Sequence, residues 1–301
     1  MVLASWRRRT LSGADMKVDN HRLKLDSGKF ASFVSTPNMG EQLAGGAPSI
    51  LVVHYTAGAT AAGAIQTFKS QSPNGRTSAH LVIDHDGQIT QMVPFDRVAW
   101  HAGASRWRGH NGINQHSIGI EVANWGKLSR TAGGGWVSWT GASIPASRVM
   151  LAPHKHFPGQ EYGWEIFDEA QIEALIAACR AIVGAYDIKG WDLVGHDDIS
   201  PIRKIDPGPA MAMDSIRSRV FGREDDAFND SLFRVNAPGD GLNLRENPGI
   251  AGSRVIKKLP HGTTVHVVEV VGSWALVAEV IGGNDDVTGF THMNWLVPAA
   301  A

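Results

Sequence analysis

The segment SILVVHYT, residues 49–56, constrains the fold of this chain more than any other feature. It is a short and continuous run of mostly β-branched residues, which is typical of a strand that is buried on both faces. The segments HSIGIEVANWG and WDLVGH are further runs of this kind, whereas residues 168–186 carry apolar side chains at helical spacing. The alternation of strands and helices predicts an α/β fold with a mixed central β-sheet flanked by helices.

Shorter signals predict how the chain enters and connects these elements. Residues 1–47 are polar and interrupted by glycine and proline, so we expect an irregular leader with one hairpin. The dipeptide Asp86-Gly87 predicts a tight turn between two strands, because these residue types accept positive φ angles. Asp168 stands where the N-cap of the long helix is expected. Residues 127–164 are rich in glycine, serine, proline and aromatic side chains, and we interpret them as a long functional loop.

The last third of the chain has a different pattern. The acidic segment GREDDAFNDS, residues 222–231, is typical of a linker. Short alternating runs such as LNLREN and TTVHVVEVV follow it, separated by glycine, proline, asparagine and aspartate, and this rhythm predicts a small all-β barrel. We therefore expect four parts: a leader (1–47), an α/β domain (48–222), a linker (223–231) and a β module (232–301).

Charge and cysteine content exclude several classes of partner and site. The chain has 28 basic and 29 acidic residues and a formal net charge of −1, so it lacks the basic excess that nucleic-acid binding requires. No window of about 18 apolar residues predicts a membrane span. Cys179 is the only cysteine, which excludes a disulfide within the chain and a cysteine-based zinc cluster. Because Cys179 lies in an apolar helical run, we expect a buried thiol.

The predicted strands end in side chains that can bind a metal. His54 and His196 each stand at the carboxyl end of an apolar strand, where open α/β sheets place their sites. Asp206 follows His196 by ten residues, which lets a loop return its carboxylate to the imidazole. Two histidines and one aspartate leave the fourth position of a tetrahedral ion open, and this is the pattern of catalytic zinc sites.

Two further charged residues can complete a hydrolytic site. Glu121 lies at the end of the apolar run SIGIEV, and a carboxylate that faces a zinc-bound water acts as a general base. An exposed acid at a strand edge is the alternative interpretation of Glu121. Lys204 precedes Asp206 by two residues, so we expect its ammonium group near the metal, where it can stabilise an oxyanion.

Three separated motifs carry a family resemblance. The segments SAHLVIDHDGQITQMVPFDRVAWHAG, NQHSIGIEVAN and GHDDISPIRKIDPGP occur in an order and spacing that resembles the type-2 N-acetylmuramoyl-L-alanine amidase family, which includes the peptidoglycan recognition proteins. The likeness covers about residues 48–220. It implies the acid/base role for Glu121 and the oxyanion role for Lys204. It also implies a Zn²⁺ cofactor held by three residues: His54, His196 and Asp206.

The resemblance further implies an enzyme and a set of substrate contacts. The aspartate as third ligand and the glutamate as acid/base resemble the residues found in the bacterial cell-wall-recycling branch of the family. Recognition proteins that have lost activity usually lack a competent third ligand, so Asp206 indicates an enzyme. Trp100, like Trp107, is interpreted either as a groove wall that stacks on sugars or as ordinary packing. The residues assigned to substrate binding are His80, Trp100, His101 and Asn124.

Several other polar residues are interpreted as surface groups. His154 and His156 stand two positions apart in the long loop, and we expect them to face solvent. Asp197, Asp198 and Arg203 lie between two of the proposed metal ligands, and we expect them to cap that loop or to be solvated.

The β module is similar to bacterial SH3-like domains, because LNLREN is followed by a glycine-containing turn and by the aromatic residue of GSW. Such modules attach enzymes to the cell wall, so we expect a targeting role. A structural appendage that only stabilises the first domain is the alternative.

These features predict a zinc amidase that hydrolyses the amide bond between N-acetylmuramic acid and L-alanine in peptidoglycan or soluble muropeptides. Two alternatives stay open, a non-catalytic peptidoglycan-binding protein and a zinc peptidase that acts within the stem peptide. No apolar segment typical of a signal peptide follows the basic N-terminus. We therefore expect either a cytoplasmic protein or one that reaches the cell wall or periplasm by a non-standard route.

Overall fold

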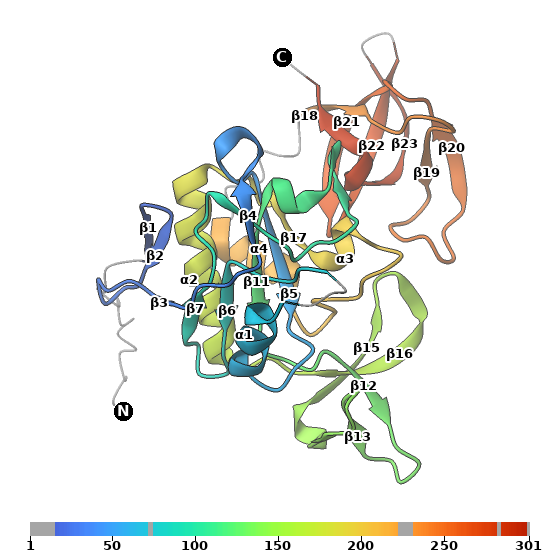
Figure 1. The fold of residues 1–301 in the computed structure, drawn as a ribbon. Helices are drawn as coiled ribbons and strands as arrows, with labels where there is room; N and C mark the ends of the chain where they lie inside the picture. The colour runs from blue at the N-terminus through green and yellow to red at the C-terminus, as the bar shows by residue number, and fades with distance from the viewer. Residues whose placement is uncertain (1–15, 72–74, 222–230, 282–283, 300–301) are drawn as a thin grey trace, which may run out of the picture.

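The computed structural model describes four stretches of the chain: residues 16–71, 75–221, 231–281 and 284–299. Figure 1 shows a central α/β unit, a β-rich arm that leaves it at the lower right, and a second β unit built from the C-terminal residues. The predicted linker, except for Ser231, and the first fifteen residues of the predicted leader lie outside the described residues.

The central sheet has six strands in the order β17-β5-β11-β6-β7-β3. β11 runs parallel to β5 and β6, β17 runs parallel to β5, and β6 pairs antiparallel with β7. The predicted mixed sheet is therefore confirmed. The strand bounds are β3 (Ser32–Phe33), β5 (Ile50–Tyr55), β6 (Leu81–Ile83), β7 (Ile89–Gln91), β11 (Ser117–Val122) and β17 (Leu193–Gly195).

β5 lies inside this sheet and is covered on both faces. Leu51 and Val53 belong to the apolar cluster that includes the long helix α2, whereas Ile50 and Val52 belong to a second cluster that includes C-terminal residues. Side chains alternate across a strand, so a strand that is covered on both sides must be apolar at every position. This is why the run at residues 49–56 is continuous.

Among the described residues, four α-helices accompany the sheet: α1 (Ala61–Lys69), α2 (Glu169–Tyr186), α3 (His196–Ile199) and α4 (Met213–Phe221). Asp168 and Gln171 form a capping box at the start of α2, which confirms the predicted N-cap. Cys179 is buried in α2 as expected. No helix within the described ranges is both long and apolar enough to cross a membrane.

Two predicted turns are also confirmed. The leader contains the expected hairpin, formed by β1 (Lys17–Asp19) and β2 (Arg22–Lys24). Gly87 has a φ of +82° between β6 and β7, and a Cβ there would lie 2.7 Å from the carbonyl oxygen of Ala170, so only glycine fits this turn. The other short strands of the α/β unit are β4 (Met39–Gln42), β8 (Arg97–Ala99), β9 (Arg106–Trp107) and β10 (His110–Asn111).

Residues 127–165, which we call the arm, form an antiparallel sheet, whereas the composition predicts a long functional loop at 127–164. Its strand order is β14-β13-β12-β16-β15. Gly163 allows close packing of two strands, because a Cβ there would lie 2.4 Å from the ring of Trp136. The small and aromatic residues therefore reflect packing within a sheet. The bounds are β12 (Lys127–Arg130), β13 (Trp136–Val137), β14 (Ser143–Ile144), β15 (Val149–His154) and β16 (Phe157–Glu165).

Residues 231–299, which we call the C-terminal unit, form a seven-stranded sheet in the order β20-β19-β23-β22-β21-β18-β24. Their described part contains strands and one short 3-10 helix, Met293–Trp295, and no α-helix. The predicted all-β composition is thus observed. The bounds are β18 (Ser231–Val235), β19 (Leu242–Arg245), β20 (Val255–Leu259), β21 (Thr264–Val271), β22 (Trp274–Ile281), β23 (Asn284–His292) and β24 (Leu296–Pro298).

The C-terminal unit packs against the α/β unit through a shared apolar cluster. Trp107 is buried in the same cluster as Phe233, so of its two interpretations packing is the one observed. Arg106 donates to the carbonyl oxygen of Asn236 at 2.9 Å, and its guanidinium lies 4.2 Å from the ring centre of Trp295. The two units are therefore joined by a packed interface in addition to the connecting chain.

Candidate metal centre

The three predicted ligands come together at the carboxyl end of the central strands. His54 is on β5, and in the parallel register it lies opposite Glu121 on β11. Gly195, the last residue of β17, is paired with Val53 of β5, so His196 begins α3 directly beside His54. Asp206 returns from the loop after α3, where its carbonyl oxygen accepts a hydrogen bond from the amide of Asp197 at 2.8 Å.

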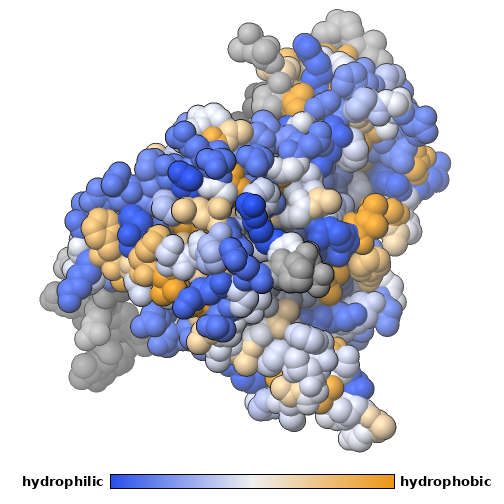
Figure 2. Space-filling view, viewed as in Figure 1, coloured by the Kyte–Doolittle hydropathy of each residue, from blue (hydrophilic) through white to orange (hydrophobic). Residues whose placement is uncertain are grey.

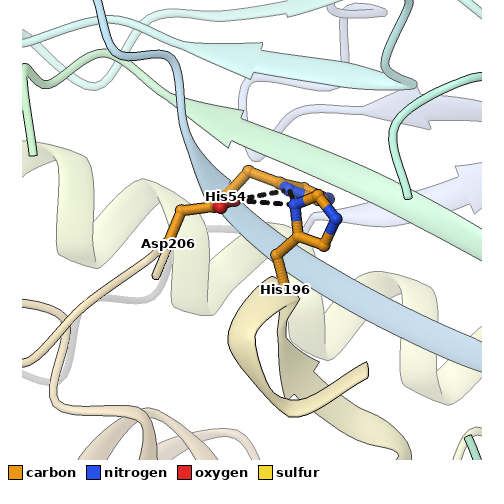
Figure 3. Close-up of side chains that lie close together, drawn as sticks. All are labelled: His54, His196 and Asp206. Atoms are coloured by element: carbon orange, nitrogen blue, oxygen red, sulfur yellow. Dashed lines mark hydrogen bonds and ion pairs between the residues drawn. The ribbon is translucent and has the colours of Figure 1, made fainter. Parts of the chain in front are cut away.

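The ligand atoms of this triad point at one another from three separate elements (Figure 3). The Nδ1 atoms of His54 and His196 are 3.0 Å apart, and each lies 2.9 Å from Oδ2 of Asp206. Around a tetrahedral zinc ion with bonds of about 2.0 to 2.2 Å, neighbouring donors lie roughly 3.3 to 3.5 Å apart. The triangle of donors is therefore close to the size that a zinc-type ion requires, and two imidazoles with one carboxylate suit its chemistry.

A chain of hydrogen bonds fixes the tautomer of His54. The Ser117 hydroxyl donates to the carbonyl oxygen of Ile113 at 2.7 Å, so its oxygen accepts from Nε2–H of His101 at 3.1 Å. Nδ1 of His101 is then the acceptor for Nε2–H of His54 at 3.0 Å. The lone pair of His54 Nδ1 is consequently directed at the shared point, as a metal ligand requires.

His196 is oriented in the same way. Its Nε2–H donates to the carbonyl oxygen of Ala102 at 3.0 Å, which leaves Nδ1 as the free acceptor. Arg203 donates to the same carbonyl oxygen at 2.8 Å, so it supports the ligand and is not merely a solvated loop residue.

Burial and mutual contacts set the charges of the triad. Burial, together with the proximity of His196, lowers the pKa of His54 to about 4, so its imidazole is neutral near pH 7. Burial alone would raise the pKa of Asp206, but its contacts with the imidazoles of His196 and His54 outweigh burial and hold the pKa well below its ordinary value. The site thus offers a neutral imidazole at His54 and an ionised carboxylate at Asp206, and both are in the state that binds a divalent metal.

The environment of Glu121 favours the protonated form of its carboxyl group. Its Oε2 atom is buried and has no hydrogen-bond partner among the described residues. Burial raises its pKa well above the ordinary value, and the nearby charge of Asp206 acts in the same direction, whereas Lys204 opposes them. The alternative of an exposed edge acid therefore does not describe this side chain.

A cavity of about 420 Å³ connects the triad with these groups. Glu121, Lys204, Trp100 and His101 all line it together with the three ligands. The Nε1–H group of Trp100 is buried and has no acceptor among the described residues. Trp100 therefore lines the cavity with a side chain whose polar atom is itself buried.

His80 and Asn124, two of the predicted substrate contacts, do not line this cavity. His80 is buried, with Nε2 donating to the carbonyl oxygen of Arg97 at 2.8 Å and Nδ1 accepting from the amide of Gly119 at 3.0 Å. Asn124 is also buried, and its amide group bonds to backbone atoms of Glu165 and of the adjoining turn. The structure thus gives both residues a supporting role, because burial commits their polar atoms to the protein.

Asp197 and Asp198, the residues after His196, are buried rather than solvated, and Asp198 caps the turn, which is the other role expected for these residues. Asp197 accepts from Nε2 of His154 at 3.0 Å and pairs with Lys155 at 2.9 Å. Asp198 pairs with Lys155 at 2.5 Å and accepts from the amide of Gly195 at 2.8 Å. Burial opposes ionisation of Asp198, but the charge of Lys155 outweighs it and lowers the pKa of Asp198 below the ordinary value.

The arm and the C-terminal unit both contact this turn. His154 and His156 are buried rather than solvent-facing, and Nε2 of His156 donates to the carbonyl oxygen of Asp197 at 2.9 Å. From the C-terminal unit, the side-chain amide of Asn294 donates to the carbonyl oxygen of Asp198 at 2.7 Å. The turn that presents His196 is therefore held from two sides. The HxH spacing in PHKHF was the one sequence signal for this contact.

The fold and the site define an α/β protein with a buried His-His-Asp cluster that can hold a metal ion, at the carboxyl ends of parallel strands. Residues 44–209, more than half of the chain, match the family described as N-acetylmuramoyl-L-alanine amidase (Amidase_2), and the chain belongs to this family.

Named relatives include two amidases of Escherichia coli strain K12. The chain is 32% identical over 208 residues to N-acetylmuramoyl-L-alanine amidase AmiD, covering 65% of this chain and 63% of AmiD. It is 35% identical over 146 residues to 1,6-anhydro-N-acetylmuramyl-L-alanine amidase AmpD, covering 48% and 58%. The chain thus spans about three fifths of the length of these curated relatives. A solved complex of E. coli AmiD with anhydro-N-acetylmuramic acid-L-Ala-D-gamma-Glu-L-Lys is 27% identical with a TM-score of 0.43, covering 68% of this chain and 65% of that one.

Proposed function

We propose that the protein is a zinc-dependent N-acetylmuramoyl-L-alanine amidase that cleaves the amide bond between N-acetylmuramic acid and L-alanine. The observation that carries the proposal is the convergence of two oriented imidazoles and one ionised carboxylate on a single point, beside the buried carboxyl group of Glu121. The reaction named for the relatives AmiD and AmpD supports the same assignment.

Zinc held by the triad would supply a Lewis acid for the substrate carbonyl and acidify water towards a pKa of about 7. The chain's own residues then move the proton. Glu121 accepts the proton of the attacking water and donates it to the nitrogen of the leaving L-alanine as the carbon–nitrogen bond breaks. Its raised pKa suits this exchange, because an acid/base group works best when its pKa is near the working pH. Lys204 stabilises the negative charge that develops on the carbonyl oxygen.

Trp100 and His101 are our proposed substrate contacts in the same cavity. Trp100 lines the cavity, and we propose that its ring forms a wall that packs against the sugar of the substrate. Both ring nitrogens of His101 are already bonded, to His54 and Ser117, so His101 contributes shape and ligand orientation.

We also propose that the chain is divided into a catalytic domain at residues 48–222 and a C-terminal module at residues 232–301. We infer that this module is SH3-like and binds the cell wall. Support comes from its seven-stranded sheet and from an open pocket of about 310 Å³ lined by Trp274, Trp295 and Arg245, among others. The second role, structural support of the first domain, is favoured by the bond from Asn294 to the ligand-bearing turn.

Digestion of purified sacculi and, separately, of soluble anhydromuropeptides, with mass spectrometry of the products, tests the reaction. An amidase releases stem peptide that begins with L-alanine and leaves a lactyl carboxylate on the sugar. A peptidase leaves L-alanine on the sugar, and a receptor binds without release.

Two variants test the roles at the site. Glu121→Ala is expected to retain one equivalent of zinc but to lose about 10²- to 10⁴-fold in turnover, because general acid/base catalysis contributes roughly that factor. Asp206→Ala is expected to lose both zinc and activity. Glu161→Ala, on the exposed part of the arm, is the matched control and should behave like the parent. Release of stem peptide by Glu121→Ala at the parent rate would show that the acid/base assignment is wrong.

A further inference from the structure

One exposed tryptophan stands at the edge of the metal cavity. Trp139 lies in the turn between β13 and β14, and its side chain is 72% exposed, more than any other tryptophan or phenylalanine in the described stretches. An indole offers a large apolar ring surface together with a single polar N–H group. In Figure 2 the arm that carries this turn forms a lobe of mixed hydropathy at the lower edge of the molecule.

The polar edge of Trp139 is fixed to the cavity wall. Its Nε1–H donates to the carbonyl oxygen of Ala57 at 2.8 Å, although the two residues are 82 positions apart. Ala57 lines the cavity together with His54 and Glu121. It also has a φ of +52°, a conformation that an alanine seldom adopts outside functional turns. The indole is thus attached to the rim at a defined point.

The turn that presents the indole is rigid. Ser138 is buried, and its amide donates to the carbonyl oxygen of Ala142 at 2.9 Å. Its hydroxyl also bonds to Thr140 at 2.8 Å and accepts from the amide of Ala142 at 3.1 Å. The side chain of Trp139 is therefore preorganised, with its nitrogen bonded and its ring faces open, so little further ordering is needed when a ligand binds.

We propose that Trp139 is a stacking subsite for a pyranose ring of the glycan strand next to the N-acetylmuramoyl residue whose amide is cleaved. This inference rests on the proposed function and names the part of the substrate that the arm recognises. A pyranose ring presents a flat face of C–H groups, which fits an open indole face. A stem peptide needs hydrogen-bonding partners, and the only polar atom of the Trp139 side chain is already bonded to Ala57.

The consequence is a preference for glycan chains over single-sugar substrates. A ligand with one anhydromuramoyl sugar fills the site at the metal and leaves Trp139 uncovered, whereas a strand with neighbouring sugars covers it. The histidines and the lysine of the segment PHKHF, also on the arm, contact the turn of α3 and not the cavity rim. The turn between β13 and β14 is the part of the arm that reaches the cavity rim.

The experiment compares full-length parent and Trp139→Ala on two substrates, an anhydromuramoyl-tripeptide and a glycan chain of several disaccharide-tripeptide units. For the chain we expect KM to rise about tenfold with kcat unchanged, which corresponds to about 1.4 kcal/mol. For the single-sugar substrate we expect both constants to stay at the parent values. Leu151→Ala, which removes a side chain 55% exposed elsewhere on the arm, is the control and should leave both substrates unaffected.

A binding measurement separates the inference from the reaction. Calorimetry with a peptide-free tetrasaccharide of alternating N-acetylglucosamine and N-acetylmuramic acid should give about tenfold weaker binding for Trp139→Ala, with Trp139→Phe in between. Equal losses on both substrates, or unchanged tetrasaccharide binding, would overturn the stacking subsite. If the parent releases no stem peptide from either substrate, the proposed function fails, while the calorimetry still decides whether Trp139 binds glycan.

Discussion

Replacing Asn294 with alanine removes one hydrogen bond that the C-terminal unit gives to the turn of His196, a proposed metal ligand. The side-chain amide donates to the carbonyl oxygen of Asp198 at 2.7 Å, and both residues are buried. Loss of the donor leaves a buried carbonyl group one partner short, which costs about 1 to 3 kcal/mol. We expect the free energy of unfolding of the metal-free protein to fall by that amount.

The same substitution should also weaken zinc binding. Asp198 stands two residues after His196 in a helix of a single turn, so a displaced carbonyl shifts the ligand that begins the turn. Groups that orient a metal ligand typically contribute 10- to 100-fold in affinity, and this more remote contact should reach about the lower end of that range. Competition against a chromogenic chelator measures the zinc affinity, and urea unfolding measures the stability.

Arg106→Ala is the matched control for this prediction. Arg106 contacts Asn236 and Trp295 in the same interface, and in the described part of the chain it has no hydrogen bond to α3. It should lower the stability and leave the zinc affinity unchanged. Equal zinc affinities for Asn294→Ala and the parent, or an equal loss in both variants, would refute a specific role of Asn294 in holding the turn.

Two further predictions concern buried charges. Lys155→Met should lower the free energy of unfolding by about 3 to 5 kcal/mol, because it leaves two buried carboxylates without their shared cation, and Lys155→Arg should restore much of it in the same urea titration. Burial lowers the pKa of His80 to about 4 in the folded protein. Between pH 6.5 and about 4 the imidazole therefore binds a proton in the unfolded chain but not in the folded chain. The free energy of unfolding consequently decreases as the pH falls through this range. Unfolding curves at pH 7 and pH 5 should show a smaller loss for His80→Gln than for the parent, and equal losses would contradict this assignment.

The triad could be predicted from the sequence because its geometry follows from local patterns. His54 and His196 end apolar runs, and runs of that kind become neighbouring parallel strands whose carboxyl ends share one edge of the sheet. Glu121 follows from the same reasoning, since it lies directly opposite His54 in the register. Asp206 needed only a loop of ten residues to return to them.

The support for the triad could not be predicted, because it depends on pairs that are far apart in the sequence. Lys155 is 43 positions from Asp198, and Asn294 is 96 positions from it. Adjacent aspartates normally indicate a solvated loop, since burial of an unpaired carboxylate is very costly. The arm was missed for a related reason, because glycine and proline weaken the strand pattern although tertiary packing on Gly163 and its neighbours favours a sheet.

α3 shows why these distant contacts matter for the metal site. A helix of four residues has no stability of its own, because the cost of starting a helix is recovered only over several turns. His196 is nevertheless its first residue, and a metal ligand must be held to within about 0.5 Å. Lys155 of the arm and Asn294 of the C-terminal unit provide the missing constraint. The sheet of the arm therefore has two roles. Lys155 supports the turn of α3, and Trp139, at the cavity rim, provides the indole surface that we propose for sugar binding.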